Sequence, residues 1–533
     1  MNPLSSKIIN ITPRDYQNKI FETAKNQNTL VVLPTGLGKT LIALMLAVDR
    51  KYLLPQSKIL FLAPTRPLIE QHFHYFKSHL PELFADLQLF TGSVQANKRK
   101  EIWQTAEIIF STPQCVANDI TSNLYDLKDI SLLIIDEAHR CLKNYDYTKV
   151  VSNYKKQSQN QRILGLTASP GHDPEKIKEI CEHLNIAEIE LRSRESDDVK
   201  HYLQSLDFEK IEVPFPKEFE ELRILLKRLW YSNVDKIRTI FPNLSPINKI
   251  TLLSLQKNLS FQIAKGNHAA YSGISMVAQA IKISHALELL ETQTLSGLRN
   301  YLNSLIKQAQ EKKSKAVQSL VKSAEFNAAL ISLEHLLFKH QEHPKIEIAS
   351  SIIKKQFSEK ENSKVIIFTQ FRETAQIIVK SLSSLPAIKA SVFIGQAKKT
   401  LTGGMSQKEQ REIIEKFKTG EINILVATSI GEEGLDIPEV NVVIFYEPIP
   451  SAIRKIQRAG RTARLAPGKL IILVTQDTRD VSHHYASGAR ERKMHRSIQT
   501  IKEELKLKKD LEQKGEQENA KIKTLDEFNK PTK

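Results

Sequence analysis

The 533-residue sequence predicts two α/β domains, each built on a doubly wound parallel sheet, with a mostly helical insertion between them. Two parts of the chain alternate short apolar runs with helical patterns, as expected when helices cover both faces of a parallel sheet. The part between them has apolar residues at helical spacing instead. We therefore expect α/β domains at residues 1–210 and 344–488, a helical insertion at 211–343, and a charged helix with a flexible tail at 489–533.

The first α/β domain is expected to contain six strands. Most candidates are continuous apolar runs bounded by turn or polar residues, which is typical of buried parallel strands. The runs are Leu30–Leu33, Ile59–Ala63, Leu87–Phe90, Ile108–Ser111, Leu132–Asp136 and Ile163–Thr167.

The insertion is expected to begin where Pro214 and Pro216 interrupt the chain. Apolar residues recur at helical spacing from Phe219 onward, and Ser245-Pro246 predicts the N-cap and first turn of a further helix. Many lysines accompany the later helical patterns, so we expect a basic face. The βα alternation then returns, with candidate strands at Val365–Thr369, Ser391–Ile394, Ile424–Thr428, Val442–Tyr446 and Leu470–Thr475.

The overall composition favours a polyanionic partner and a reducing compartment. The formal net charge is +17 and the pI is near 9.4, which favours nucleic acid, although charge alone leaves open a merely solvated basic surface. The cysteines Cys115, Cys141 and Cys181 show neither a metal-type pairing nor an even disulfide framework. The sequence predicts no membrane span and no apolar signal core. We therefore expect a cytoplasmic, nucleoid-associated protein.

A glycine-rich loop between a predicted strand and a predicted helix has the context of a phosphate-binding loop. Small residues let backbone N–H groups converge on phosphate oxygens at a helix N-terminus, where the helix dipole favours anions. Lys39 is expected to reach the β- and γ-phosphates, and the Thr40 hydroxyl to hold Mg²⁺. The general pattern has Gly where this sequence has Leu33. The loop comprises Pro34, Thr35, Gly36, Leu37, Gly38, Lys39 and Thr40.

Two adjacent carboxylates, Asp136 and Glu137, end one of the predicted strands. A Mg²⁺ ion bound to nucleotide phosphates needs a carboxylate at the carboxyl end of a strand, and Asp136 supplies it. Glu137 is placed to orient or deprotonate the attacking water. Together with the upstream loop, this pair predicts a site that hydrolyses a nucleotide.

Two further segments predict nucleotide contacts. Gln17 follows Arg14 just before the first strand, and a Gln side chain can pair with the amino group and N7 of adenine, so Gln17 is expected to select ATP. Between Gln457 and Arg464, arginines three residues apart fall on one helix face. Arginine is the usual residue that stabilises a transferring phosphoryl group in trans, from across the cleft that faces the phosphate loop. If this helix faces the phosphate loop, Arg461 and Arg464 act as arginine fingers.

Taken together, these segments resemble the motifs of the superfamily 2 helicases. They follow one another in the order of those motifs and cover nearly the whole chain to about residue 490. The adenine-reading element and motifs Ia, Ib, II, III, IV, V and VI correspond to Arg14–Gln17, Ala63–Leu68, Ser111–Gln114, Asp136–His139, Leu166–Pro170, Phe368–Arg372, Ala427–Pro438 and Gln457–Arg464. Motif VI departs from the usual pattern at Ala463, which is normally Gly.

Within that superfamily, the sequence is most similar to the archaeal Hef helicase domain and its eukaryotic relative FANCM. The Ala138-His139 ending of motif II, the block Gly165–Gly171 and the helical insertion carry this resemblance. It implies two RecA-like domains, ATP and Mg²⁺ as cofactors, and a 3′→5′ motor on forked, branched or single-stranded DNA. Two alternatives stay open: a double-stranded-RNA-stimulated ATPase of the RIG-I or Dicer type, and a clamp-tethered recruitment platform.

The resemblance also implies roles for individual residues. The catalytic group would comprise Lys39, Asp136, Glu137, Gln457, Arg461 and Arg464. The second domain would touch the nucleotide through Gly434 and Asp436, while coupling between hydrolysis and domain movement would involve His139, Thr167 and Ser169. The residues expected to hold the nucleic-acid backbone without reading its sequence are Thr65, Arg66, Thr112, Gln370, Arg372 and Thr428.

Two C-terminal segments resemble motifs of larger assemblies. Longer Hef members carry a nuclease with a Glu-Arg-Lys signature, and Glu491-Arg492-Lys493 copies its letters. The acidic residues that accompany that signature are missing from the sequence, so we expect a helix surface and no nuclease. Near the end, Leu525 and Phe528 resemble a degenerate sliding-clamp-binding motif, with a random tail as the alternative.

Overall fold

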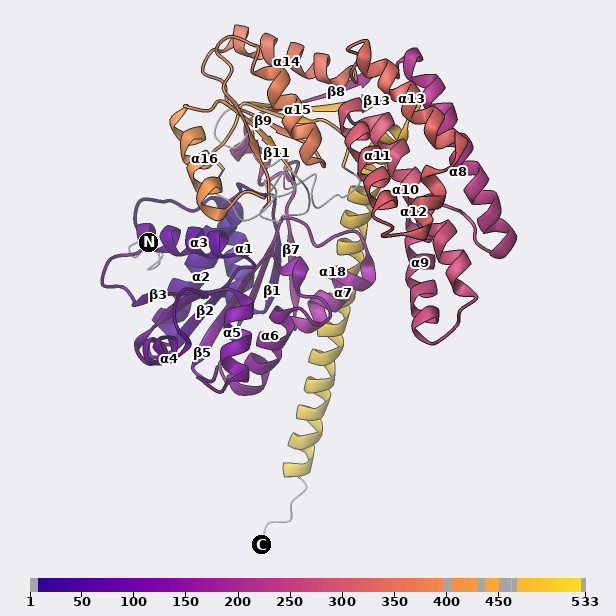
Figure 1. Cartoon of the computed structure of the whole chain (residues 1–533). Coiled ribbons are helices and arrows are strands. Elements are labelled where there is room, and N and C mark those ends of the chain that lie inside the picture. Colours follow the sequence, from indigo (N-terminus) through magenta and orange to yellow (C-terminus); the bar gives the residue numbers. More distant parts are fainter. Residues whose placement is uncertain (1–7, 396–403, 429–436, 450–461, 463–466, 529–533) are drawn as a thin grey trace.

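The computed structural model describes residues 8–395, 404–428, 437–449, 462 and 467–528, with side chains described up to residue 511. This part of the chain forms two α/β domains, a helical insertion and a long C-terminal helix (Figure 1). The fold class predicted from the sequence is therefore confirmed.

The first domain is built on a seven-stranded parallel sheet in the order β3-β4-β2-β5-β6-β1-β7. Six strands match the predicted apolar runs. The edge strand β7 was not predicted, because its Glu-Ile-Glu-Leu sequence alternates polar and apolar residues. The strands are β1 (Thr29–Val32), β2 (Lys58–Leu62), β3 (Leu87–Phe90), β4 (Ile108–Ser111), β5 (Ile130–Asp136), β6 (Ile163–Thr167) and β7 (Glu188–Leu191).

Helices cover both faces of this sheet, and each face has its own apolar core. In β5, Leu133 and Ile135 pack into one cluster, while Leu132 and Ile134 pack into the other. A central strand that is apolar on both sides needs both covers. The helices are α1 (Asp15–Asn26), α2 (Lys39–Leu53), α3 (Arg66–His79), α4 (Ala96–Thr105), α5 (Pro113–Thr121), α6 (Asp146–Gln157) and α7 (Pro174–His183), with short turns η1 (Ala138–Arg140) and η2 (Lys200–Tyr202).

Within the described ranges, the second domain has a six-stranded parallel sheet in the order β10-β11-β9-β12-β13-β8. Its strands are β8 (Leu206–Val213), β9 (Val365–Phe368), β10 (Ala390–Phe393), β11 (Ile424–Ala427), β12 (Val442–Phe445) and β13 (Gly468–Thr475). The helices described beside them are α14 (Lys345–Glu359), α15 (Arg372–Leu382) and α16 (Gln407–Thr419).

Strand β8 precedes the insertion in sequence but belongs to the second sheet. It pairs with β13 over its full length, from Leu206 opposite Gly468 to Val213 opposite Thr475. The domain boundary expected at residue 210 therefore lies inside this strand. Its half-exposed sequence mixes polar and apolar residues on both faces, so it carries no buried-strand signal.

The insertion is an all-helical bundle. A short η3 turn (Lys217–Phe219) leads into it, and two apolar clusters hold it together. Helix α9 begins at Lys249, because the Asn248 side chain caps it by accepting hydrogen bonds from two backbone N–H groups; the start expected at Ser245-Pro246 was wrong. The helices are α8 (Glu220–Ile240), α9 (Lys249–Ala264), α10 (Ala270–Thr292), α11 (Leu295–Gln310), α12 (Lys315–Val321) and α13 (Ala324–Phe338).

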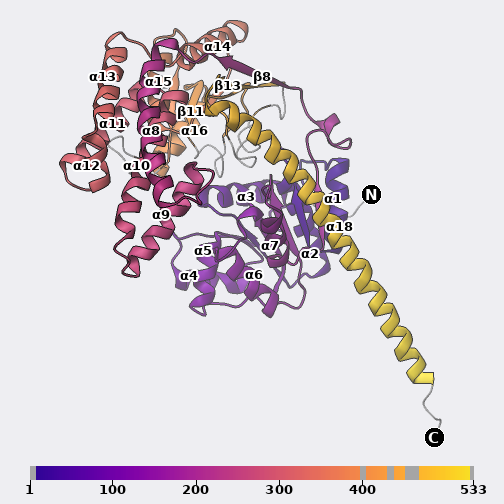
Figure 2. The same cartoon turned by 90° about the vertical axis from the view of Figure 1, so that its right-hand side faces the viewer.

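The C-terminal helix α18 (Arg479–Phe528) joins the two domains. Figure 2 shows it leaving β13 and running along the first domain to a free end beyond it. Met494, Ile498 and Ile501 enter an apolar core of the first domain, and Glu504 lies 3.0 Å from Lys178 of α7. No helix in the described ranges is long and apolar enough to cross a membrane.

A buried ion pair anchors the start of α18 in the second domain. Lys345, the first residue of α14, is fully buried against Asp480, whose side chain also accepts a hydrogen bond from the backbone N–H of Thr475. A buried charge that loses its partner is strongly destabilising. This pair therefore fixes α14, β13 and α18 relative to one another.

We expect Lys345→Met to lower the free energy of unfolding by about 3 kcal/mol, because Asp480 keeps its burial and loses its counterion. Urea denaturation followed by circular dichroism measures this. The matched control is Lys355→Met on the same helix, where the Lys is exposed and its pair with Glu359 spans 4.0 Å; a loss below about 0.5 kcal/mol is expected there. Equal effects of the two substitutions would contradict the anchoring role.

Candidate functional site

The phosphate loop connects β1 to α2 and depends on two glycines. Gly36 and Gly38 have φ angles of +88° and +79°, in the left-handed region where a side chain is strained. A Cβ on Gly38 would lie 2.3 Å from Gln17 Nε2. Gly38 is also the N-cap of α2, so the loop presents its backbone at a helix N-terminus.

Leu33 stands where the general pattern has Gly, and its backbone is used instead of its side chain. Its N–H donates to the Thr167 carbonyl at 3.0 Å, and its carbonyl accepts a hydrogen bond from Lys39 Nζ at 2.7 Å. The Leu33 side chain is buried in the core beside α2. The Lys39 ammonium is thereby held over the loop.

The two predicted metal ligands are joined by a residue that the sequence did not single out. His72 of α3 places Nε2 2.7 Å from Asp136 Oδ2 and Nδ1 3.3 Å from Thr40 Oγ1. Burial by itself would raise the pKa of Asp136, but His72 and Lys39 lower it below its ordinary value. Asp136 is thus an ionised carboxylate beside a hydroxyl, and such hard oxygen donors suit Mg²⁺ held together with substrate phosphates.

Glu137 lies just beyond β5 in a strained conformation. Its φ of 51° is unusual for a residue with a side chain. Glu137 Oε2 is buried and, among the described residues, accepts no hydrogen bond, although His139 Nδ1 lies 3.2 Å away. A carboxylate oxygen without a donor is suited to accept a hydrogen bond from a water molecule.

A line of polar contacts leads from Glu137 to the C-terminal helix. His139 Nδ1 lies 3.1 Å from Thr167 Oγ1, and the Thr167 hydroxyl donates to the Ser169 carbonyl at 3.0 Å. The Ser169 hydroxyl in turn donates to Met494 Sδ of α18 at 2.8 Å. The three predicted coupling residues therefore lie together, and their contact with Met494 could not be predicted from the sequence.

The predicted adenine-reading residues lie against the phosphate loop. Arg14 is the N-cap of α1, and its backbone N–H donates to Gln17 Oε1 at 2.8 Å. Gln17 Nε2 donates to the Leu37 carbonyl at 3.1 Å, and the Tyr16 hydroxyl donates to the same carbonyl at 2.8 Å. An adenine contact would therefore require the Gln17 amide to exchange these partners.

The residues predicted to hold nucleic acid all follow the carboxyl ends of parallel strands. In the first domain, Thr65 and Thr112 occupy the N-cap positions of α3 and α5, and the buried Thr65 hydroxyl oxygen has no partner among the described residues. Arg66 bonds to Glu70 at 2.7 Å. The members in the second domain follow β9 and β11, and they are Gln370, Arg372 and Thr428.

A buried polar network supports the Gln370 segment. The Glu447 side chain accepts hydrogen bonds from the backbone N–H of Gln370 at 2.6 Å, from the Thr369 hydroxyl at 3.2 Å and from Gln293 Nε2 at 3.3 Å. Gln293 ends helix α10 of the insertion. The network therefore ties the insertion to the predicted nucleic-acid loop of the second domain.

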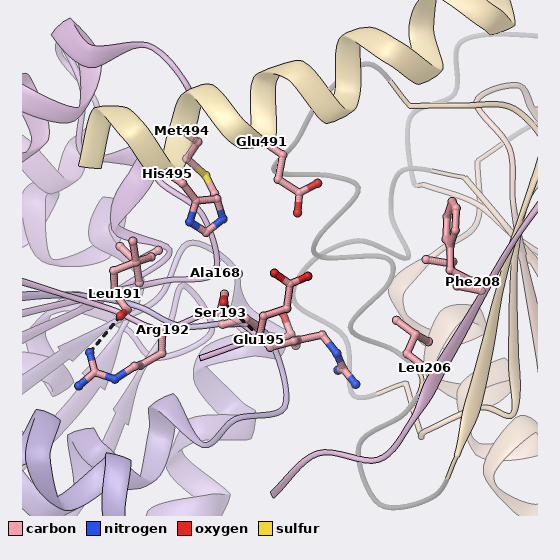
Figure 3. Close-up of a pocket in the computed structure, with 15 residues that line it drawn as sticks. Ala168, Leu191, Arg192, Ser193, Glu195, Leu206, Phe208, Glu491, Met494 and His495 are labelled. Carbon is pink, nitrogen blue, oxygen red and sulfur yellow. Dashed lines mark hydrogen bonds between the residues drawn. The ribbon is translucent and has the colours of Figure 1, made fainter. Parts of the chain in front are cut away.

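A cavity of about 460 Å³ lies between the domains beside the phosphate loop (Figure 3). Helix α18 forms one side with Glu491, Met494 and His495, and β8 forms another side with Leu206 and Phe208. The segment after β7 completes the wall with Arg192, Ser193, Arg194 and Glu195. Glu491, expected on a plain helix surface, thus faces this cavity.

Several predicted residues fall elsewhere. Gly434, Asp436, Gln457, Arg461 and Arg464 lie outside the described residues, as does Ala463. Leu525 and Phe528 lie in α18 beyond the residues whose side chains are described.

Family models match three consecutive parts of the chain. Residues 14–177 match the DEAD/DEAH box helicase model and residues 344–466 match the helicase conserved C-terminal domain. Residues 218–339, which include helices α8 to α13, match the model described as "Putative ATP-dependent RNA helicase, helical bundle". The two motor domains and the insertion are thus each matched separately.

Curated relatives are about one third identical to this chain over the aligned residues. A Methanocaldococcus jannaschii protein that bears the same RNA-helicase name is 37% identical over 491 residues, which are 92% of this chain and 61% of that protein. The ATP-dependent DNA helicase fml1 of Schizosaccharomyces pombe is 34% identical over 90% of this chain and 59% of that helicase. The Fanconi anemia group M protein homolog of Mus musculus is 32% identical over 93% of this chain and 26% of that protein. The chain therefore spans less than two thirds of the length of these relatives.

A solved structure matches over nearly its whole length. The Hef helicase domain of Pyrococcus furiosus is 41% identical to this chain, with a TM-score of 0.68. The match covers 89% of this chain and 98% of that domain. The chain therefore belongs to the Hef family of DEAD/DEAH box helicases.

Proposed function

We propose that this chain is an ATP-driven motor that moves 3′→5′ along DNA and acts on forks and junctions during replication-fork repair and recombination. The observation that carries the proposal is the cluster at the carboxyl edge of the first sheet. There, Lys39 and Thr40 follow the glycine loop after β1. Asp136 is the last residue of β5, and Glu137 follows it directly. Family membership supports ATP as the nucleotide.

The chemistry follows from the position of each side chain. Loop N–H groups and Lys39 hold the β- and γ-phosphates, while Thr40 and Asp136 hold Mg²⁺, whose charge offsets the charge of the phosphates. The buried Glu137 Oε2, which accepts no hydrogen bond from the described residues, orients the attacking water. Gln17 and Arg14 hold the adenine side of the nucleotide. The second domain completes the site with Gly434, Asp436, Gln457, Arg461 and Arg464.

Domain movement is coupled to this chemistry through the line of contacts from His139 to Met494. A change at Glu137 alters His139, then Thr167 and Ser169, each within hydrogen-bonding distance of the next. Because Met494 lies on α18, which starts in the second domain, the line ends on an element that both domains share. The two domains close when ATP binds and open after hydrolysis, so they grip the DNA strand alternately.

The nucleic-acid grip is shared between the domains. Thr65, Arg66 and Thr112 hold phosphates from the first domain, and Gln370, Arg372 and Thr428 hold them from the second. These contacts carry no sequence information, which suits a motor that must move over any sequence.

The insertion provides a second nucleic-acid contact at the end of its α9–α10 hairpin. Residues 236–287 contain no Asp or Glu, whereas Lys257 and Lys265 are exposed. The ring of Phe261 is 59% exposed with Lys265 Nζ 4.5 Å above it, and Tyr271 is 54% exposed. Basic side chains and exposed rings together are typical of single-strand binding, where bases stack on aromatic faces.

A second candidate function is supported by two of the names. The model that matches the insertion and the Methanocaldococcus relative are both named for RNA helicases, whereas the fungal relative is named a DNA helicase. Steady-state ATPase discriminates between them when single-stranded DNA, duplex DNA, forked DNA, a four-way junction and duplex RNA are compared at one salt concentration. Strongest stimulation by forks or junctions supports the proposal, and strongest stimulation by duplex RNA replaces it with an RNA-stimulated ATPase.

The C-terminal end of α18 is proposed to bind a sliding clamp through Leu525 and Phe528. Such a tether and a DNA substrate would both keep the protein at the nucleoid. Clamp affinity that is unchanged in the Leu525→Ala, Phe528→Ala double variant would remove the idea.

We expect Lys39→Ala to lower nucleic-acid-stimulated ATP turnover at least about 100-fold, because a phosphate donor and its charge are lost at the point of bond cleavage. Phosphate release under saturating forked DNA measures this. The control Lys98→Ala changes an exposed Lys of α4 and should leave turnover unchanged. Near-normal turnover in the Lys39 variant would refute the assignment of the loop.

A charge-removal experiment tests the hairpin contact. We expect Lys257→Gln with Lys265→Gln to reduce the slope of log affinity against log salt for forked DNA by about 2, one for each lost phosphate contact, with basal ATPase unchanged. The matched control replaces exposed Lys354 and Lys355 of α14 by Gln. If the salt slope changes equally in both pairs, or in neither, the hairpin is not the contact.

A further inference from the structure

Helix α3 carries three features that the proposed function uses separately. Its first turn holds Arg66, one of the proposed phosphate contacts. Its next turn holds Glu70, which bonds across the domain interface to Arg411 of α16 at 2.8 Å. Its buried face holds His72, which lies between Thr40 and Asp136. Arg66 and His72 are six residues apart, about 9 Å along a helix.

The hydrogen bond of His72 to Asp136 has a defined direction. An ionised carboxylate can only accept, so His72 Nε2 donates to Asp136 Oδ2 at 2.7 Å. In the neutral imidazole, Nδ1 then accepts from the Thr40 hydroxyl at 3.3 Å. The Thr40 oxygen keeps its lone pairs, and Asp136 keeps its other oxygen, for a metal ion. His72 therefore orients both donors, as outer-sphere partners of metal ligands commonly do.

The imidazole moves only with its helix. His72 is 6% exposed, and its ring packs on Phe61 of β2 with 4.5 Å between the centroids. Phe61 in turn contacts Phe76 of the same helix and Phe110 of β4. Close packing of this kind leaves the side chain little freedom to compensate for a displacement of α3.

The first two turns of α3 are bonded to groups that are expected to move when nucleic acid binds or the domains close. One Glu70 oxygen accepts from Arg66 Nε at 2.7 Å, and the other accepts from Arg411 of the second domain at 2.8 Å. Arg66 and Arg411 therefore share one carboxylate. A phosphate that draws Arg66 away, or a domain movement that displaces Arg411, acts directly on α3.

We propose that His72 is a positioning residue through which α3 couples nucleic-acid contact and domain closure to the two metal ligands. The inference rests on the proposed function and adds a second route from the nucleic-acid side to the ATP site, besides the line through His139 and Ser169. It assigns His72 no contact with the nucleotide itself. His72 acts by orienting Thr40 and Asp136, so its loss should change how nucleotide binding depends on Mg²⁺ and on DNA.

The test measures binding, and then turnover, in two variants and a control. His72→Phe keeps an aromatic ring on Phe61 and removes both hydrogen bonds, whereas His72→Gln keeps a donor and an acceptor. His74→Gln changes an exposed histidine of the same helix. Affinity for a fluorescent non-hydrolysable ATP analogue is titrated against Mg²⁺ with and without saturating single-stranded DNA, and ATPase stimulation is measured in parallel.

In the wild type, DNA should raise the affinity for the Mg²⁺-bound analogue, and by linkage the analogue should change DNA affinity by the same factor. We expect His72→Phe to raise the half-saturating Mg²⁺ concentration about 10-fold and to abolish the effect of DNA on nucleotide binding. His72→Gln should recover part of both, and His74→Gln should match the wild type.

Three outcomes decide against the inference. An unchanged DNA effect in His72→Phe shows that the coupling bypasses His72. Equal losses in the Phe and Gln variants, together with a lowered melting temperature, show that His72 only fills space. A wild-type protein whose ATPase responds to no nucleic acid contradicts the proposed function itself, and thereby removes the coupling that His72 was inferred to carry.

Discussion

The parallel pairing of every strand in both sheets is the constraint on which the site depends. In a parallel sheet, each carboxyl end opens onto the same edge, and crossover helices return the chain to the other edge. The phosphate loop after β1, Asp136 at the end of β5 and Thr167 at the end of β6 are therefore brought together, although Val32 and Thr167 lie 135 positions apart in the sequence. The same rule puts the loops after β2 and β4 on this edge.

Much of this arrangement could be predicted from sequence, because the decisive signals are local. A strand buried on both faces must be apolar throughout, so β5 and β9 are visible without any knowledge of their partners. Likewise, the glycines at 36 and 38 and the paired carboxylates at 136 and 137 show their chemistry within a few residues. Each of these patterns depends on the burial and chemistry of a single segment, so it can be recognised without knowing which distant segment lies beside it.

What could not be predicted depends on distant pairing. Strand β8 mixes polar and apolar residues on both faces, and nothing in its sequence shows that it pairs with β13, more than 250 residues later. His72 resembles any core histidine until the fold brings it to Asp136, at the end of β5. The contact between Ser169 and Met494 joins residues that lie 325 positions apart. A single sequence shows the chemistry of a segment but not which segments meet.

The insertion and the second domain are connected in a way that makes them one mechanical unit. Glu447 bonds to Thr369 and Gln370 of the second domain and to Gln293 of the insertion, all within a buried network. Breaking such a network would leave buried polar groups unpaired, which is costly. We therefore infer that the hairpin of α9 and α10 moves with the second sheet during each cycle of closure.

The continuous helix α18 also makes the molecule sensitive to helical phase. Asp480 is fixed in the second domain and Met494 in the first, and the thirteen residues between them are helical. One added or removed residue in this stretch would turn everything after it by about 100°. Met494, Ile498 and Ile501 would then leave the core together, even though each side chain is unchanged. The exposed face of this segment can change in composition during evolution, while its length is constrained by the angle between its two anchors.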